Sequence, residues 1–352
     1  MMPLSYHEQE DKKIYLKLKE LLKELPLFCT AFFRGIEPRT QSRTRLAYAY
    51  DLGIFFHFLK ETNPLYKNSE IRDLDISVMD SVNARDIEEY MEYLKYRPGS
   101  DEYEIANKEN GVKRKISSLK SFYNYLYENE MISSNPAALV HLPKIREKEI
   151  IRLDYDEVAR LLDEAESGEQ LTEKQKTYHK LTRKRDVAIL SLLLGTGMRI
   201  SECVGIDLKD IDIEETAVRL HRKGGKEETV YFSDEVAEAL KPYIEERKNI
   251  NACPGSENAL FLSLQNRRIS VRSAENMVKK YAQAVTPLKH ITPHKLRSTY
   301  GTHLYQETGD IYLVADVLGH SDVNTTKKHY AAINEDRRRA ARKAVRLREE
   351  PD

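Results

Sequence analysis

A stretch near the carboxyl end of the chain, residues 294–330, holds the side chains best suited to chemistry on a phosphate. It opens with His294 and Arg297, and the Thr-Pro pair at 292–293 before them is typical of a helix start. Residues three positions apart lie on one helix face, so both basic groups are expected to point the same way, near the positive end of the helix dipole. Such a face suits an anion, although a capped helix with two solvated basic side chains has the same pattern.

Two further basic residues lie upstream in turns that would fix their positions. An apolar segment, 187–194, runs into a Gly-Thr-Gly turn, and Arg199 follows near the start of the next helix. A turn of this kind holds a guanidinium beside backbone amides. Lys223 stands at the tip of a predicted β-hairpin, 220–232, where apolar residues alternate on both sides of a Lys-Gly-Gly-Lys turn. Each pattern alone is also typical of an ordinary surface turn, so only the combination indicates a site.

A metal site is the main alternative chemistry, because four histidines lie close together: His294, His303, His320 and His329. They lack the His-Glu-x-x-His or Cys-x-x-Cys spacing of zinc sites and have no acidic partners. The sequence therefore predicts no metal and no other cofactor. His303 lies in an apolar stretch and is expected to be a packing residue.

Length and composition indicate a soluble protein of two domains. The chain has 352 residues, of which 40% are hydrophobic and 32% charged, and its mean hydropathy is −0.62. It has neither a membrane-spanning apolar run nor a signal sequence, so a cytoplasmic location without membrane contact is expected. The three cysteines, Cys29, Cys203 and Cys253, are scattered and are expected to be reduced.

The net charge of zero argues mildly against a nucleic-acid partner, but the basic residues are unevenly distributed. Clusters of them could form a face that binds phosphates, while ordinary solvated helices would explain any single cluster equally well. The residues expected to contact DNA are Arg39, Arg43, Arg45, Lys113, Arg114, Lys120, Arg267 and Arg268.

The amino-terminal part, 1–148, is predicted to be helical throughout. Helices are expected at 13–25, 40–60, 83–96 and 107–128. In the second helix the apolar residues at helical spacing are Leu46, Tyr50, Ile54 and Phe58. In the last helix the stripe Ile116, Leu119, Phe122, Tyr123 and Leu126 is expected to be core and not a base-stacking platform.

A proline-marked charged connector, 142–148, places the domain boundary at 148/149. The second domain is expected to start with a capped helix from 153 to 165, followed by a polar surface insertion, 166–181, of unknown role. Beyond the hairpin, whose preceding strand is expected at 208–213, the sequence predicts a helix at 234–248, a strand at 260–262 and a helix at 271–284.

Several motifs in this order resemble the tyrosine recombinase (phage integrase) family. They are Thr-Gly-Met-Arg-Ile-Ser-Glu at 196–202, the Lys-Gly-Gly-Lys hairpin, His-x-Leu-Arg at 294–297, Leu-Gly-His at 318–320 and the tyrosine at 330. The resemblance covers nearly the whole chain. Within the family it is strongest to the Xer recombinases, in particular to the single-recombinase XerS type.

The resemblance implies a mainly α fold with a small antiparallel β-sheet, built as a two-domain, C-shaped DNA clamp. Residues 1–148 would form a helical core-binding (SAM-like) domain, and 149–352 the catalytic tyrosine recombinase domain. By the same resemblance Arg199 and Arg297 clamp the scissile phosphate, Lys223 is the general acid, and Tyr330 is the nucleophile that forms the 3′-phosphotyrosine. The two site histidines would be His294 and His320.

The chemistry explains these residue types. A phosphodiester under attack gains charge on its non-bridging oxygens, and fixed guanidinium groups stabilise that charge without a metal. A tyrosine hydroxyl titrates near about 10, so it needs a base or a strong local field to attack at neutral pH. One departure from the Xer pattern is that His320 and Tyr330 are one residue further apart than usual, with His329 directly before the tyrosine.

The function implied is site-specific DNA recombination without ATP, resolving chromosome dimers at a dif-like palindromic site. The family implies a homo-tetramer on two DNA sites, joined through the C-terminal helix at 337–347, and commonly an FtsK-type DNA translocase as partner. Two alternatives stay open. An integrase of a phage or transposable element often has an extra arm-binding domain, for which the residues before the catalytic domain are too few. An architectural DNA-binding protein would be expected to lack some of the six site residues, and all six are present.

Overall fold

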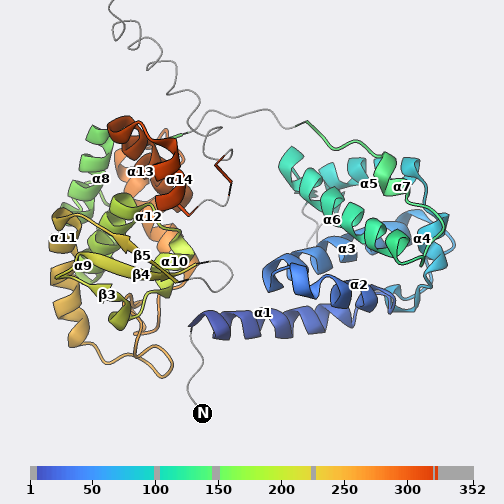
Figure 1. Ribbon diagram of the computed structural model, residues 1–352, viewed down its shortest axis with the longest axis horizontal. Coiled ribbons are helices and arrows are strands. Elements are labelled where there is room, and N and C mark those ends of the chain that lie inside the picture. Colours follow the sequence, from blue (N-terminus) through green and yellow to red (C-terminus); the bar gives the residue numbers. More distant parts are fainter. Residues whose placement is uncertain (1–5, 99–103, 145–150, 223–226, 320–321, 324–352) are drawn as a thin grey trace, which may run out of the picture. The chain divides into compact units, whose positions relative to one another are not determined.

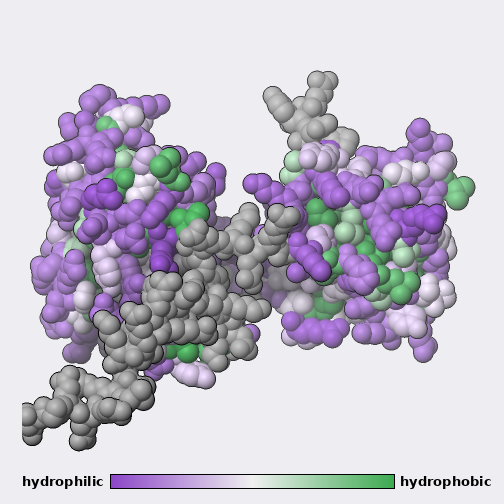
Figure 2. Space-filling model, turned by 90° about the horizontal axis from the view of Figure 1, so that it is seen from above, coloured by the Kyte–Doolittle hydropathy of each residue, from purple (hydrophilic) through white to green (hydrophobic). Residues whose placement is uncertain are grey.

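The computed structural model describes residues 6–98, 104–144, 151–222, 227–319 and 322–323. The chain divides into two compact units, Met1–Lys148 and Glu149–Asp352, each with its own elements (Figure 1). Both are mainly helical, and the second contains a three-stranded antiparallel sheet, so the predicted fold class is confirmed. The faces seen in Figure 2 are mostly hydrophilic, with apolar residues in separate patches. Within the described residues no helix has the length and apolarity needed to cross a membrane.

The first unit is a helical bundle with one short hairpin. Its elements are α1 (Tyr6–Leu22), α2 (Cys29–Gly35), η1 (Glu37–Arg39), α3 (Ser42–Thr62), η2 (Ile71–Asp73), α4 (Ser77–Ser81), α5 (Ala84–Lys95), β1 (Tyr96–Pro98), β2 (Glu104–Ala106), α6 (Glu109–Glu128) and α7 (Pro136–Leu139). The β1–β2 hairpin shows that the prediction of helix throughout was wrong here. Because a residue before proline disfavours helical torsions, Arg97 and Tyr96 leave the helix and pair with Ile105 and Ala106.

The core of the first unit is aromatic. Phe32, Phe55, Phe56 and Phe122 are all at most 1% exposed, and the whole predicted stripe on α6 is buried with them, which confirms it as core. The stripe expected on α3 was partly wrong, because Tyr50 is 41% exposed while its neighbours on another face are buried. That helix buries Leu52, Phe55, Phe56 and Leu59 together with the carboxylate of Asp51.

The second unit is built around one long helix, α9 (Glu173–Thr196). Four elements pack against it: α8 (Tyr155–Ser167), α10 (Ile200–Gly205), α11 (Asp234–Lys248) and α13 (Pro293–Thr308). Its residues Val187 to Leu193 are buried on all sides, which explains why they are apolar without periodicity. The remaining helices are α12 (Val271–Val285) and α14 (Ile311–Val317).

The sheet of the second unit has the order β3-β4-β5, from β3 (Ile211–Asp212), β4 (Ala217–His221) and β5 (Glu227–Tyr231). The predicted hairpin is therefore present, with Val218 opposite Val230 and His221 opposite Glu227. The strand expected at 208–213 is shorter, because η3 (Leu208–Asp210) precedes it. The strand expected at 260–262 was also wrong: the β-bridge in this segment, Leu262 with Arg268, is isolated.

Most of the segment 166–181 is exposed, as predicted, and the structure shows that it consists of the end of α8, a short turn and the start of α9. Gly168 ends α8 in the left-handed conformation, and Thr172 begins α9 by accepting a hydrogen bond from the backbone N–H of Gln175. The polar composition therefore reflects a helix end and a helix start, which need side-chain caps. His179, inside this segment, is buried at 5% exposure.

Candidate active site

Arg199 lies where α9 gives way to α10. Gly197 ends α9 with φ of +63°, and a Cβ at this position would lie 2.4 Å from the ring of Tyr300, so the turn requires glycine. Glu202 then accepts a 2.7 Å hydrogen bond from the Arg199 backbone N–H and another from Nη1 of its side chain. The guanidinium is thus held at the start of α10 while its side chain stays 40% exposed. An arginine so fixed and still accessible can bind a phosphate oxygen.

Arg297 lies one turn into α13 and is only 5% exposed. Its Nη1 donates to the carbonyl of Gly197 at 2.7 Å, and its Nη2 donates to the carbonyl of Leu318. The side chain therefore fastens the turn before Arg199 to the end of α14. Arg199 contacts the next residue of the same turn, because its Nη2 lies 3.4 Å from the carbonyl of Gly319. The structure thus brings together two arginines that are far apart in the sequence.

His294 is exposed in the first turn of α13, directly after Pro293. Its backbone carbonyl accepts a 3.0 Å hydrogen bond from Ser298 Oγ. It lies one helical turn before Arg297, as the spacing predicted. The other three expected site residues, Lys223, His320 and Tyr330, lie outside the described residues, and so does the segment 337–347.

The sequence reasoning missed two residues that hold this site together, Glu202 and Arg222. Glu202 is 5% exposed in its side chain and orients Arg199, which its position three residues along a helix start could have indicated. Arg222 donates to the carbonyls of Leu318 and Val317, at 2.8 and 3.0 Å. No local pattern reveals this contact, because the partners are 96 and 95 residues apart in the chain.

Five of the eight expected DNA-contacting residues carry no internal ion pair to a carboxylate among the described contacts. Arg39, Arg43 and Arg267 are exposed, while Lys113 and Lys120 are half-buried on α6. These side chains are the ones most able to reach a phosphate backbone.

The other three, Arg45, Arg114 and Arg268, are engaged with carboxylates inside the protein. Arg45 is 8% exposed and lies 2.6 Å from Glu37, and Arg268 pairs with Asp207 and donates to the carbonyls of Val204 and Ile206. Arg114 makes a two-pronged pair with the buried Asp51, with Nη2 2.7 Å from Oδ1, although half of its side chain is exposed. Their contacts give them structural roles.

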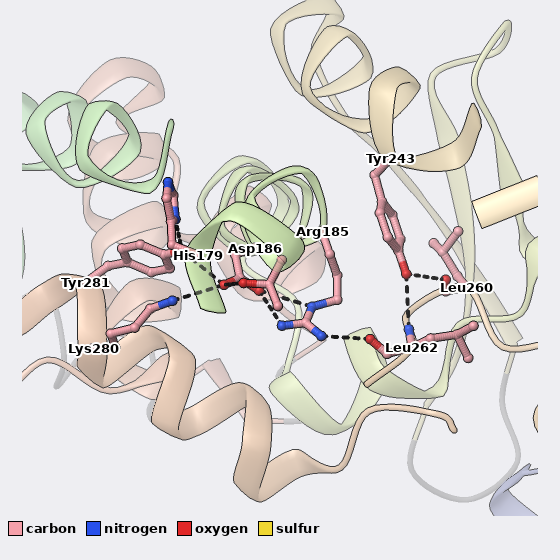
Figure 3. Close-up of polar contacts among 9 residues, drawn as sticks. His179, Arg185, Asp186, Tyr243, Leu260, Leu262, Lys280 and Tyr281 are labelled. Carbon is pink, nitrogen blue, oxygen red and sulfur yellow. Dashed lines mark hydrogen bonds and ion pairs between the residues drawn. The ribbon is translucent and has the colours of Figure 1, made fainter. Parts of the chain in front are cut away.

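A buried polar cluster supports α9 at a distance from these arginines (Figure 3). Asp186, at 1% exposure, accepts hydrogen bonds from Arg185 Nη2 at 2.6 Å, Thr182 Oγ1 at 2.9 Å, Tyr281 Oη at 3.0 Å and Lys280 Nζ at 3.2 Å. The carboxylate thereby joins α9 to α12. A buried charge of this kind is tolerated only because both of its oxygens are fully paired.

His179 completes the cluster from the segment once expected to be an insertion. Its Nδ1 lies 3.0 Å from Tyr281 Oη. Because that hydroxyl donates to Asp186, the imidazole must donate its own Nδ1–H to the hydroxyl oxygen. Burial and the nearby Lys280 lower the pKa of His179, which favours this neutral form.

Replacing Asp186 by alanine is expected to lower the free energy of unfolding by about 3–5 kcal/mol, because Arg185 and Lys280 would remain buried without their anion. Denaturant titration of the purified protein measures this loss. Lys184→Ala is the matched control on the same helix, α9. It removes a surface ion pair with Glu246 of α11 and should lower the free energy of unfolding by at most about 1 kcal/mol. Equal effects of the two substitutions would contradict the role of the cluster.

His303 packs as expected, stacked on the ring of Tyr155 with centroids 3.9 Å apart. Burial lowers its pKa, which suits a neutral packing histidine. Among the described residues no group of three or more His, Cys, Asp or Glu side chains could hold a metal ion.

Comparison with known proteins identifies the family whose sequences resemble this chain. The family model described as the phage integrase family matches residues 151–337. A tyrosine recombinase XerC of Caldanaerobacter subterraneus subsp. tengcongensis is 32% identical over 90% of this chain and 86% of its own. A tyrosine recombinase XerS of Streptococcus equi subsp. zooepidemicus is 29% identical over 92% of this chain and 97% of its own.

Solved structures agree on the fold. The Tn1549 transposon integrase in complex with transposon right end DNA aligns with a TM-score of 0.64 at 20% identity, over 90% of this chain and 99% of that one. The XerH site-specific recombinase bound to palindromic difH substrate aligns with a TM-score of 0.62 at 18% identity, over 86% and 80%.

Fold and motifs thus define an enzyme that breaks and rejoins DNA strands at specific sites. The chain belongs to the phage integrase family of tyrosine recombinases, and the two relatives named above are of the Xer type. The XerH recombinase structure was solved with DNA bound, and so was a lambda integrase dimer on a core site.

Proposed function

We propose that this recombinase resolves chromosome dimers at a dif-like palindromic site in the cytoplasm. The observation that carries the catalytic part is the meeting of Arg199 and Arg297 on the backbone of one turn, 318–319, directly before His320. The similarity to Xer recombinases along most of the chain supports the biological part. We assign the unit 1–148 to DNA binding and the unit 149–352 to catalysis.

In the proposed reaction, the hydroxyl oxygen of Tyr330 attacks the scissile phosphorus and the bond to the 5′ oxygen breaks. Arg199 and Arg297 stabilise the charge that develops on the non-bridging oxygens. His294 accepts the tyrosine proton, His320 donates a hydrogen bond to the phosphate, and Lys223 donates a proton to the leaving 5′ oxygen. The 3′-phosphotyrosine conserves the energy of the broken ester, so a second strand can attack it and rejoin without ATP.

The DNA backbone would be held by the exposed residues Arg39, Arg43 and Arg267 and by Lys113 and Lys120 on α6. Three further residues would contribute indirectly, by keeping the nearby protein backbone in place, because their guanidinium groups are already paired with carboxylates: Arg45, Arg114 and Arg268. We further propose that four chains assemble on two DNA sites through the segment 337–347, and that an FtsK-type DNA translocase activates the assembly.

The test is a nicked duplex that carries a candidate chromosomal palindrome and traps the covalent intermediate. Incubated in EDTA, the protein should form a covalent adduct with this duplex and not with a scrambled one, and native mass spectrometry should detect four chains with two duplexes. Adducts on the ends of a mobile element, and none on chromosomal palindromes, would favour the integrase alternative. Binding to palindromes without any adduct would instead indicate an architectural protein.

A further inference from the structure

Arg222 is the last described residue before the tip of the β4–β5 hairpin, and its guanidinium is buried, with 7% of the side chain exposed. Two of its nitrogens donate to the end of α14: Nη1 to the carbonyl of Leu318 at 2.8 Å, and Nη2 to that of Val317 at 3.0 Å. Its Nε lies 2.8 Å from Glu228 on β5, an ion-pair distance without the alignment of a hydrogen bond. One side chain therefore ties both strands of the hairpin to α14.

This contact requires a glycine directly after Leu318. Gly319 has φ of +60°, and a Cβ at this position would lie 1.8 Å from Nη1 of Arg222. Even a residue that tolerated the left-handed conformation would therefore collide with the guanidinium. The glycine lets Arg222 lie directly against the turn.

The carbonyl of Leu318 accepts from two arginines at once, because Arg297 donates to it as well. This single oxygen joins the end of β4, the first turns of α13 and the end of α14. In the sequence, Lys223 follows Arg222 and His320 follows Gly319. The contact is thus made by residues that lie within two positions of both proposed catalytic residues in the chain.

We propose that Arg222 is a positioning residue for recombination. Its hydrogen bonds to Val317 and Leu318 hold the base of the hairpin against α14 and thereby position Lys223 for catalysis. The inference rests on the proposed role of Lys223 as general acid. A guanidinium suits this task, because its planar fork can bind two carbonyls and still face a carboxylate. Arg222 itself touches no reacting atom. Its loss would leave the hairpin free to adopt other positions, and a misplacement of about 1 Å can cost about 100-fold in rate.

A leaving-group substitution isolates this effect. In normal cleavage the Tyr330 oxygen bonds to phosphorus, the bond to the 5′ oxygen breaks, and the Lys223 ammonium gives its proton to that oxygen. When sulfur replaces the 5′ bridging oxygen, the leaving thiolate needs no proton, because a thiol has a pKa of only about 8.5. A defect in delivery of the general acid should therefore vanish on the sulfur substrate, whereas a defect in phosphate binding should persist.

The experiment measures adduct formation on oxygen and sulfur duplexes for the wild type, Arg222→Ala, Lys223→Ala and Arg219→Ala. We expect Arg222→Ala to slow cleavage of the oxygen duplex about 10- to 100-fold and to cleave the sulfur duplex at close to the wild-type rate. Lys223→Ala should show the same pattern on the two duplexes. Arg219, exposed on the same strand, is the charge-matched control, and its substitution should leave the ratio of the two rates unchanged. If Arg222→Ala proves unfolded by its melting curve, Arg222→Lys, which keeps the charge but loses the fork, replaces it.

Three outcomes would overturn the inference. Equal slowing of Arg222→Ala on both duplexes would mean that the residue acts through the phosphate site or through general stability. A normal rate on the oxygen duplex would mean that the hairpin needs no such tie. If Lys223→Ala cleaves the sulfur duplex as slowly as the oxygen duplex, the proposed role of Lys223 is wrong. If Lys223→Ala regains the wild-type rate on the sulfur duplex and Arg222→Ala does not, only the role of Arg222 is rejected.

Discussion

Replacing Tyr330 by phenylalanine is expected to eliminate the covalent protein–DNA adduct. The hydroxyl oxygen is the atom that bonds to phosphorus in the proposed reaction, and no other tyrosine lies between His320 and the end of the chain. Loss of a nucleophile typically lowers the rate by about 10⁴-fold or more, which is beyond detection in a gel assay of the trapped adduct.

The matched control for this substitution is Tyr178→Phe, which removes an exposed hydroxyl on α9 outside the proposed site. It should form adduct at the wild-type rate. Both variants should shift the palindromic duplex in a native gel, since neither substitution removes a cation that binds phosphate. An adduct with Tyr330→Phe would show that another side chain, such as the adjacent His329, is the nucleophile.

Replacing Arg297 by alanine is expected to have the second-largest effect, a loss of about 10³-fold in the rate of adduct formation. The estimate follows from removal of a fixed cation from the transition state of phosphoryl transfer. The same substitution should reduce stability by about 1–3 kcal/mol, because the carbonyl of Gly197 would lose its donor. The carbonyl of Leu318 would still accept a hydrogen bond from Arg222, so loss of the bond from Arg297 to this carbonyl should lower stability less.

Arg297→Lys separates the two roles of this side chain. The ammonium keeps the charge, but a single point donor cannot hold two carbonyls and a phosphate together. We therefore expect an intermediate rate, measured under conditions where melting curves show both variants to be folded. The control is Lys241→Ala, which removes an exposed cation from α11. A folded Arg297→Ala protein that cleaves within about tenfold of the wild type would contradict the assignment of this arginine to the phosphate.

Local signals explain which parts of the fold could be predicted. The helix starts at Asp154 and Asn83 follow from caps, and the hairpin follows from alternating residues around a Lys-Gly-Gly-Lys tip. The core face of α3 was harder to predict, because the helix is apolar on several faces. Its buried Asp51 becomes compatible with the core only through Arg114 and Ser118, which lie on another helix.

The family, the helical class and the residues of the proposed chemistry could all be predicted without a structure, because they depend on residue types and short spacings. Arg199 could be recognised from the glycine turn before it, and Arg297 from the helix start before His294. Which of the basic residues remain accessible depends on the tertiary structure, since Arg45 and Arg268 each pair with a carboxylate of the same unit.

The tertiary structure also decided how the site is held together. The contacts of Arg222 and Arg297 with the carbonyl of Leu318 join segments that are distant in the chain. A backbone carbonyl is present at every residue, so the sequence carries no mark of the one that two arginines will share. The fold selects it by bringing the end of β4 and the first turns of α13 to the end of α14, and that selection exists only in the folded unit.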